Sequence, residues 1–202
     1  MRINHISIDD KLNGFLIGSK LGDGAFIKKS NNHNTYVVFK HSEKQLDYIQ
    51  WKYDFLKSYG AIKDTNTIEK VNMVGCFPTK NQQYSFRTKS FVEFNQYVEK
   101  PYIELIKDMN IISLITWIMD DGGFQNGGIC KIAFPNKTIE EKFTVLNTLL
   151  KKFELSCYMY EHPTNRAKDY ILIRKSSYKY LKQTALDVFG DLETVRSKMQ
   201  WK

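Results

Sequence analysis

The spacing of apolar residues predicts one amphipathic helix in each half of the chain, over 42–59 and over 139–154. The apolar positions that recur at helical intervals are Leu46, Ile49, Tyr53 and Leu56 in the first segment, and Phe143, Leu146, Leu150 and Phe153 in the second. Two capping boxes are expected to begin these helices, formed by Ser42 with Gln45 and by Thr138 with Glu141. The helical phenylalanines expected in the core are Phe55, Phe143, Phe153 and Phe189.

Strand-like stretches lie on both sides of each amphipathic helix, at 26–40, 71–89, 124–135 and 156–175. Short helices are expected after the second and fourth pair of strands, over 91–97 and 178–189. Each half therefore reads as helix, two strands, helix, two strands, helix. We place the halves at 1–98 and 112–202, with a connection at 99–111 that is too short and too apolar for a floppy linker. The halves are expected to pack directly on each other.

An internal repeat supports this division. The stretch LIGSKLGDG at 16–24 and the stretch LITWIMDDG at 114–122 are apolar helical runs that both end in Asp-Gly. In the helix that contains the first run, Gly14, Gly18 and Gly22 fall four positions apart, on one face. Three glycines inside a helix cost about 2–3 kcal/mol relative to alanine. Close approach of a second helix backbone would offset this cost, so we expect a helix pair between the halves.

Such a helix pair would bring Asp23 and Asp121 close together at the two helix ends. A helix C-terminus carries partial negative charge, and an acid there is unfavourable by about 0.3–1 kcal/mol. Mg²⁺ would relieve this repulsion, because carboxylate and carbonyl oxygens are the ligands it prefers. Metal ions held between acids and a phosphate support phosphodiester hydrolysis. A single Asp-Gly is ordinary turn chemistry, but two copies in register favour a metal site.

Charge and composition narrow the choice of partner. Lys and Arg number 30 against 22 Asp and Glu, so the net charge is +8, which indicates nucleic acid first and an acidic membrane second. The N-terminus does not resemble a signal peptide, and no run approaches the roughly 18 apolar residues of a membrane helix. We expect an intracellular protein of the cytoplasm or of an organelle matrix. The cysteines and histidines show no ligand spacing, so neither a zinc site nor a disulfide framework is expected.

These motifs resemble the LAGLIDADG homing endonuclease family in its single-chain, two-motif form, over about residues 12–200. The stretch SLITWIMDDGG at 113–123 is specific, whereas the first motif keeps only the apolar pattern, Gly18 and Asp-Gly. The resemblance implies an α+β fold, a pseudo-two-fold duplication of αββαββα half-domains whose two antiparallel sheets form a DNA-binding saddle. It also implies a monomer that cleaves both strands of a long DNA duplex with Mg²⁺, leaving short 3′ overhangs. Mn²⁺ or Ca²⁺ would substitute for Mg²⁺ in binding.

Carried onto this chain, the resemblance makes Asp23 and Asp121 the catalytic metal ligands. Gly22 and Asp120 complete the candidate metal site, although Asp120 is expected to cap its helix or to hold a lysine rather than to act directly. Lys100 and Lys198 match the basic residue that the family uses near the end of each half to stabilise the phosphate or to polarise water.

The resemblance also implies that the sheet of each half lies in the DNA major groove. Arg and Lys can bind guanine there, and Asn and Gln can pair with adenine. The expected DNA-binding residues are Lys28, Lys29, Asn32, His33, Lys40, Lys80, Gln82, Gln83, Arg87, Lys89, Gln125, Lys131, Tyr158, Tyr160, Arg166, Lys168, Arg174 and Lys175. Roughly half of these are expected to contact DNA, many through phosphates, which position the protein without specifying sequence.

Two alternatives share the same scaffold. The first is a maturase that binds intron RNA and helps the intron splice, since a basic sheet serves either polymer. The second is a DNA-binding protein that has lost nuclease activity, and the presence of both acids and both lysines argues against it.

Overall fold

The computed structural model describes residues 4–71, 81–125, 128–134, 138–161 and 169–199. Its first half contains α1 (Asp10–Leu21), β1 (Ala25–Ile27), β2 (Tyr36–Ser42), α2 (Leu46–Ser58), β3 (Glu69–Val71), β4 (Gln83–Arg87) and α3 (Gln96–Glu99). The remaining elements are α4 (Tyr102–Asp108), α5 (Ile111–Asp121), β5 (Gly122–Phe124), β6 (Cys130–Ala133), α6 (Ile139–Phe153), β7 (Cys157–Tyr160), β8 (Tyr170–Ile173), α7 (Tyr178–Phe189) and α8 (Glu193–Met199).

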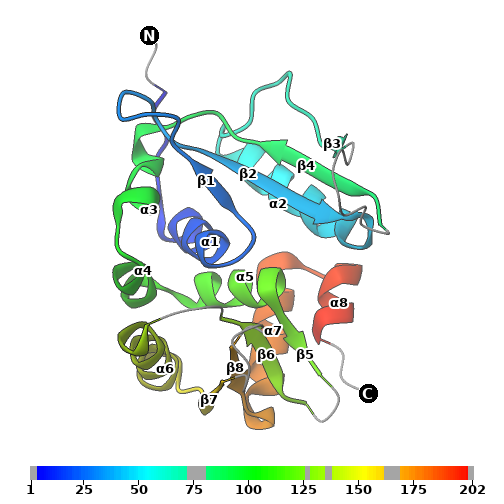
Figure 1. Ribbon diagram of the computed structural model, residues 1–202. Helices are drawn as coiled ribbons and strands as arrows, with labels where there is room; N and C mark the ends of the chain where they lie inside the picture. The colour runs from blue at the N-terminus through cyan, green and yellow to red at the C-terminus, as the bar shows by residue number, and fades with distance from the viewer. Residues whose placement is uncertain (1–3, 72–80, 126–127, 135–137, 162–168, 200–202) are drawn as a thin grey trace.

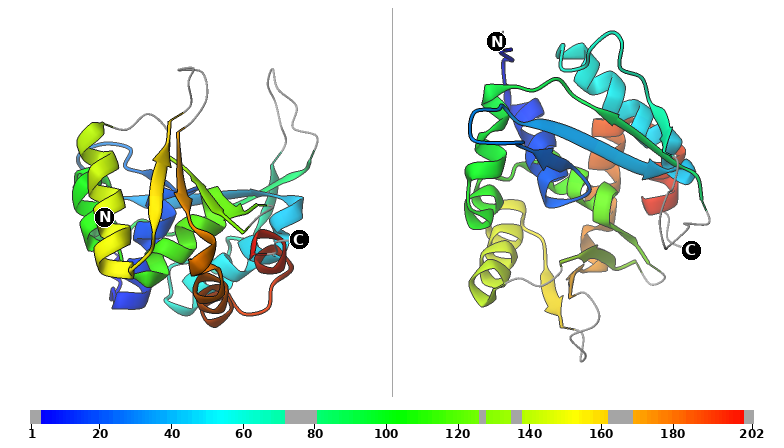
Figure 2. Two further views of the ribbon diagram at one scale, coloured as in Figure 1. Left: turned by 90° about the horizontal axis from the view of Figure 1, so that it is seen from below. Right: turned by 45° about the horizontal axis from the view of Figure 1, so that its top comes forward.

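The strands form two four-stranded antiparallel sheets with the same topology. The strand order is β1-β2-β4-β3 in the first sheet and β5-β6-β8-β7 in the second. The sheets splay apart toward one side of the molecule, while the helices gather on the other side (Figure 2). The expected α+β duplication is therefore confirmed.

Helices α1 and α5 pack together at the centre of the molecule (Figure 1). A Cβ atom on Gly18 would lie 2.6 Å from the Cβ of Thr116, and a Cβ on Gly22 would lie 2.5 Å from the Cβ of Asp120. Real Cβ atoms do not approach other atoms so closely, so the helices reach this distance only because the facing positions are glycine. The expected glycine-lined helix pair is present.

One of the two expected capping boxes is wrong. Thr138 and Glu141 form theirs, whereas Ser42 makes no side-chain capping bond. Ser42 is still the last residue of β2 and pairs with Gln83. A short 3₁₀ turn, Glu43–Gln45, follows it, and α2 begins only at Leu46.

The expected buried face of α6 is also wrong. Phe143 is 64% exposed and Leu150 is 55% exposed, whereas Val145 and Leu149 are buried. The helix packs against α4 and β7, and these contacts turn the Val145 side of the helix inward. Of the other phenylalanines expected in the core, Phe189 is buried. Phe55 and Phe153 are half-buried and pack against the hydrophobic core.

The connection between the halves is itself folded. It contains α4, which packs against α6. The single helix expected over 91–97 is instead a 3₁₀ turn, Val92–Phe94, followed by the short α3. No helix in the described part of the chain is long and apolar enough to cross a membrane.

Candidate metal centre and nucleic-acid surface

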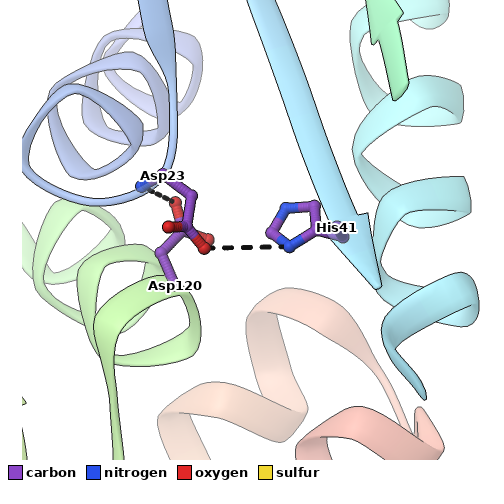
Figure 3. A group of neighbouring side chains, drawn as sticks. All are labelled: Asp23, His41 and Asp120. Carbon is purple, nitrogen blue, oxygen red and sulfur yellow. Dashed lines mark hydrogen bonds and ion pairs between the residues drawn. The ribbon is translucent and has the colours of Figure 1, made fainter. Parts of the chain in front are cut away.

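The two Asp-Gly motifs meet where α1 and α5 end. Asp23 follows Gly22, the C-cap of α1, and its backbone N–H donates a hydrogen bond of 3.1 Å to Oδ2 of Asp120. Asp120 and Asp121 are the last two residues of α5. The side chains of Asp23 and Asp120 lie together at these helix ends, with the ring of His41 on β2 facing them (Figure 3). The fold thus joins the C-termini of the two helices through a carboxylate.

Asp120 is fully occupied by donors from the first half of the chain. Its Oδ1 accepts a hydrogen bond of 2.8 Å from the Tyr48 hydroxyl and one of 2.6 Å from Nζ of Lys52. The side chains of Asp120 and Lys52 are both 0% exposed. Asp120 therefore carries three hydrogen bonds and a lysine counter-charge from within the protein.

Asp23 is the accessible acid of this group, with 37% of its side chain exposed. Partial burial, together with the negative charges of Asp120 and Asp121, raises the pKa of the Asp23 carboxyl to about 7, although Lys52 and Lys198 oppose the shift. An acid in these surroundings gains from a bound cation, which would offset the crowded negative charge. The donor set, carboxylate oxygens at two helix ends, fits the hard cations Mg²⁺ and Mn²⁺.

His41 lies next to the acids, although no motif in the sequence points to this position. It is 2% exposed, its Nδ1 lies 3.8 Å from Oδ2 of Asp23, and its Nε2 lies 3.1 Å from Nζ of Lys52. Burial and the positive charge of Lys52 lower the pKa of His41 to about 3, so the ring is neutral. Ligand atoms of Asp23, His41 and Asp120 all lie within 4.8 Å of one another.

The two candidate lysines lie in different surroundings. Lys198, on α8, is half-buried and donates hydrogen bonds to the backbone carbonyls of Met119 and Asp120, the second at 2.9 Å. Burial lowers the pKa of Lys198, and the acids around it oppose that shift. Lys100 follows α3 and pairs with Asp108 at 2.8 Å. Lys198, but not Lys100, is among the strongest charges acting on Asp23.

Asp121 faces the second sheet. It lines a surface hollow together with Gly122, Gln125, Lys131 and Tyr170. The ammonium of Lys131 lies 3.5 Å from the centre of the Tyr170 ring, a cation–π contact. Asp121 is half-buried and carries an interaction of its own. The two motif acids therefore face different sheets. Asp23 lies next to His41 of the first sheet, and Asp121 lies next to the second sheet.

The candidate DNA-binding residues gather mainly in three surface hollows. One is lined by Lys29, His33, Arg87 and Lys89, the second by Gln125 and Lys131, and the third by Tyr158, Arg174 and Lys175. Asn32, Lys40 and Tyr160 are exposed, and Lys28 pairs with Glu99. The Gln82 side chain donates hydrogen bonds to the backbone carbonyls of Val71 and of the half-buried Gln83. Lys80, Arg166 and Lys168 lie outside the described residues.

Sequence reasoning missed Tyr48 and Lys52 as well as His41. One signal was visible: Lys52 stands three residues after Ile49 and four before Leu56, on the apolar stripe of its helix. A lysine at such a position must find a buried partner. Nothing local in the sequence identifies Asp120, 68 positions away, as that partner.

Comparison with known proteins gives the family. A model of the LAGLIDADG DNA endonuclease family matches residues 13–181. The chain belongs to this family. The match extends from α1 into α7, so it includes both Asp-Gly motifs of this LAGLIDADG protein and both of its sheets.

Two curated relatives of the chain carry different descriptions, a maturase and a RecA protein. The cytochrome b mRNA maturase bI2 of Debaryomyces hansenii is 22% identical over 162 residues, covering 76% of this chain and 61% of that protein. Protein RecA of Mycolicibacterium chitae is 29% identical over 111 residues, covering 54% of this chain and 25% of that protein. The LAGLIDADG chain thus spans only part of the length of the relatives it matches.

Solved structures share the fold. The homing endonuclease I-WcaI bound to its DNA recognition sequence superposes with a TM-score of 0.72 at 20% identity, over 98% of this chain and 89% of that one. I-DmoI in complex with DNA and Mn superposes with a TM-score of 0.53 at 13% identity, over 91% of this chain and 98% of that one. These likenesses establish that the LAGLIDADG chain has the fold of single-chain homing endonucleases.

Proposed function

We propose that this protein is a site-specific, metal-dependent endonuclease that cleaves both strands of a DNA duplex. The observation that carries the proposal is the juxtaposition of the two helix ends, which crowds Asp23 among Asp120 and Asp121 and raises its pKa to about 7. A divalent cation suits such a site because it removes the repulsion and binds a phosphate oxygen at the same time.

The residues divide the work. Asp23 and Asp121 would hold divalent cations, which would supply Lewis-acid activation of the phosphate and of water. Lys52 neutralises the charge of the Asp120 carboxylate. Asp120 also accepts a hydrogen bond from the backbone N–H of Asp23, so it connects the C-terminal ends of α1 and α5. Lys198, anchored on the carbonyl oxygens at the end of α5, supplies a positive charge beside the reacting phosphate. The same role for Lys100 requires release of its ion pair with Asp108.

The basic and aromatic side chains on the two sheets supply the DNA surface. Their placement in hollows on both halves, together with a net charge of +8, suits a long duplex that spans the two sheets. The protein is proposed to act as a monomer, because one chain already contains both motif acids.

The test is cleavage of a duplex library with randomised centres, followed by sequencing of the cut ends. Wild-type protein is expected to cut one sequence class with Mg²⁺ or Mn²⁺ and to bind without cutting in Ca²⁺. Asp23→Asn and Asp121→Asn are expected to abolish cutting while DNA affinity stays within a few fold. Asp54→Asn, on the exposed side of α2, is the matched control. Cutting that persists in both motif variants would refute the assignment.

A second function is favoured by one observation, the match to a protein described as an mRNA maturase. Under this alternative, the basic surface binds structured intron RNA. Splicing of a candidate host intron, measured with the Asp23→Asn protein, separates the two functions. Splicing support without DNA cleavage by the wild type would favour the maturase.

A further inference from the structure

A buried lysine and a buried histidine lie next to the acids, and the proposed function uses Lys52 only to neutralise Asp120 and does not use His41 at all. Lys52 is 0% exposed, and its ammonium lies 2.6 Å from Oδ1 of Asp120 and 3.1 Å from Nε2 of His41. Burying an ionised side chain is costly even when it is paired. A cluster of this kind needs an explanation beyond packing.

The cluster exists on one side of the pseudo-two-fold axis. Tyr48 and Lys52 are buried polar residues four apart on α2, whereas the buried residues four apart on α6 are the apolar Val145 and Leu149. On the helix pair, Gly22 faces Asp120, and a Cβ on Gly22 would already clash there. The two helices thus leave room for one carboxylate where Gly22 faces Asp120. Among the described residues, the hydrogen-bond donors to that carboxylate all come from the first half of the chain.

The contact between Lys52 and His41 determines where the imidazole carries its hydrogen. An ammonium group has donors and no acceptor, so Nε2 of His41 must accept from it. A neutral ring that accepts at Nε2 carries its hydrogen on Nδ1. The buried Nδ1 has no hydrogen-bond partner among the described residues, and Oδ2 of Asp23 lies 3.8 Å away. Gln45 also contacts the ring.

We propose that Lys52 and His41 are positioning residues for Asp23: Lys52 holds His41 in the Nδ1–H tautomer, and this N–H orients Oδ2 of Asp23. A hydrogen bond of about 2.9 Å needs the half-exposed Asp23 side chain to move by about 1 Å toward the ring. The second oxygen of Asp23 then faces outward. This assignment rests on the proposed function only in treating Asp23 as a cation ligand.

The same geometry argues against His41 as a direct metal ligand. Coordination at Nδ1 requires a lone pair on that atom. With Lys52 donating to Nε2, Nδ1 carries a hydrogen instead. His41 is therefore assigned as a hydrogen-bond donor to the Asp23 carboxylate. Hydrogen bonds of this kind commonly orient carboxylates that bind metals.

The first test does not depend on nuclease activity. Long-range ¹H–¹⁵N correlation spectra of wild-type protein labelled with ¹⁵N-histidine report which ring nitrogen carries hydrogen. The His41 signals are assigned by their loss in His41→Asn. We expect His41 to be the Nδ1–H tautomer at pH 7 and to lose that preference in Lys52→Met. An Nε2–H tautomer in the wild type would overturn the proposal.

The second test measures single-turnover cleavage of a target duplex by enzyme in excess. His41→Leu removes the donor, whereas His41→Asn keeps an N–H at the place of Nδ1. We expect His41→Leu to cut about 10–100-fold more slowly and to need more Mg²⁺ for half-maximal rate, with unchanged DNA affinity. His41→Asn should recover most of the rate, and the exposed His5→Ala serves as control. Equal defects in His41→Leu and His41→Asn would show that His41 contributes packing and not a hydrogen bond to Asp23, which would overturn the proposal.

The two tests separate failure of this inference from failure of the proposed function. A wild-type protein that cuts no DNA removes the endonuclease but leaves the tautomer measurable. A protein that cuts DNA with His41 in the Nε2–H form keeps the endonuclease and removes the inference.

Discussion

Lys52→Met would remove the buried ammonium of the central cluster and leave the Asp120 carboxylate at 0% side-chain exposure. Methionine matches the lysine stem in shape and keeps its apolar contacts. The carboxylate retains the Tyr48 hydroxyl and the Asp23 backbone N–H as donors, yet it loses its counter-charge at 2.6 Å. Removing one partner of a buried ion pair typically costs about 3–5 kcal/mol. Because two donors remain, we expect a loss of about 3 kcal/mol in the free energy of unfolding.

Such a loss is large beside a total stability of about 5–15 kcal/mol. For a chain of this length, it corresponds to a fall in Tm of about 6–12 °C. Circular dichroism during guanidinium unfolding at pH 7.5 measures it, and Lys57→Met, at an exposed position of the same helix, should change stability by less than about 0.5 kcal/mol.

The double variant Lys52→Met/Asp120→Asn tests the cause. With the carboxylate neutral, most of the loss should disappear, so the double variant is expected to be more stable than Lys52→Met alone. A loss below about 1 kcal/mol in Lys52→Met would contradict the reasoning. A double variant that shows the full sum of the two single losses would contradict it as well.

Three further predictions concern the helix pair, the motif acid and the DNA surface. Gly18→Ala places a Cβ 2.6 Å from that of Thr116 and should destabilise the protein by more than about 3 kcal/mol, far more than Gly60→Ala, where a Cβ meets open space and only a positive φ is strained. Asp23 has a pKa of about 7 in the folded protein against 3.8 without the fold, so its ionisation opposes folding as pH rises through this interval. Asp23→Asn should therefore stabilise the protein above pH 7, by about 1–2 kcal/mol after allowance for the 37% exposed side chain; thermal melts should show this gain fading toward pH 4, and a pH-independent difference would count against it. DNA affinity measured by fluorescence anisotropy should fall by about 10³-fold or more between 50 and 200 mM salt if six or more phosphates are contacted, and a flat response would exclude the basic sheets as the binding surface.

The sequence predicts the parts of this fold that depend on local pattern. The Asp-Gly repeat, the glycines of α1 and the capping box at Thr138 are short-range signals, and the structure contains each of them. The failures come from tertiary context. Phe143 has helical spacing but lies outward, because contacts with α4 and β7 decide which face of α6 is buried. Ser42 has capping spacing, but β2 continues through it.

The candidate site divides in the same way. Asp23 and Asp121 are visible in the sequence because they repeat, whereas His41 and Lys52 occur once and reach the acids only through the fold. Lys52 meets Asp120 across 68 positions, from a helix of the other half. A contact between residues so far apart produces no periodic pattern in a single sequence. The strongest indication of the buried pair is therefore a lysine among the apolar positions of a helix.

The unlike residues at Gly22 and Asp120 determine which halves can pair through this helix contact. Two first halves assembled with each other would place glycine against glycine and leave Lys52 of each copy without the Asp120 carboxylate that it contacts at 2.6 Å. Two second halves would press carboxylate against carboxylate, without the Lys52 ammonium that binds it here. The contacts at this level of the helix pair therefore favour association of a first half with a second half over association of two like halves.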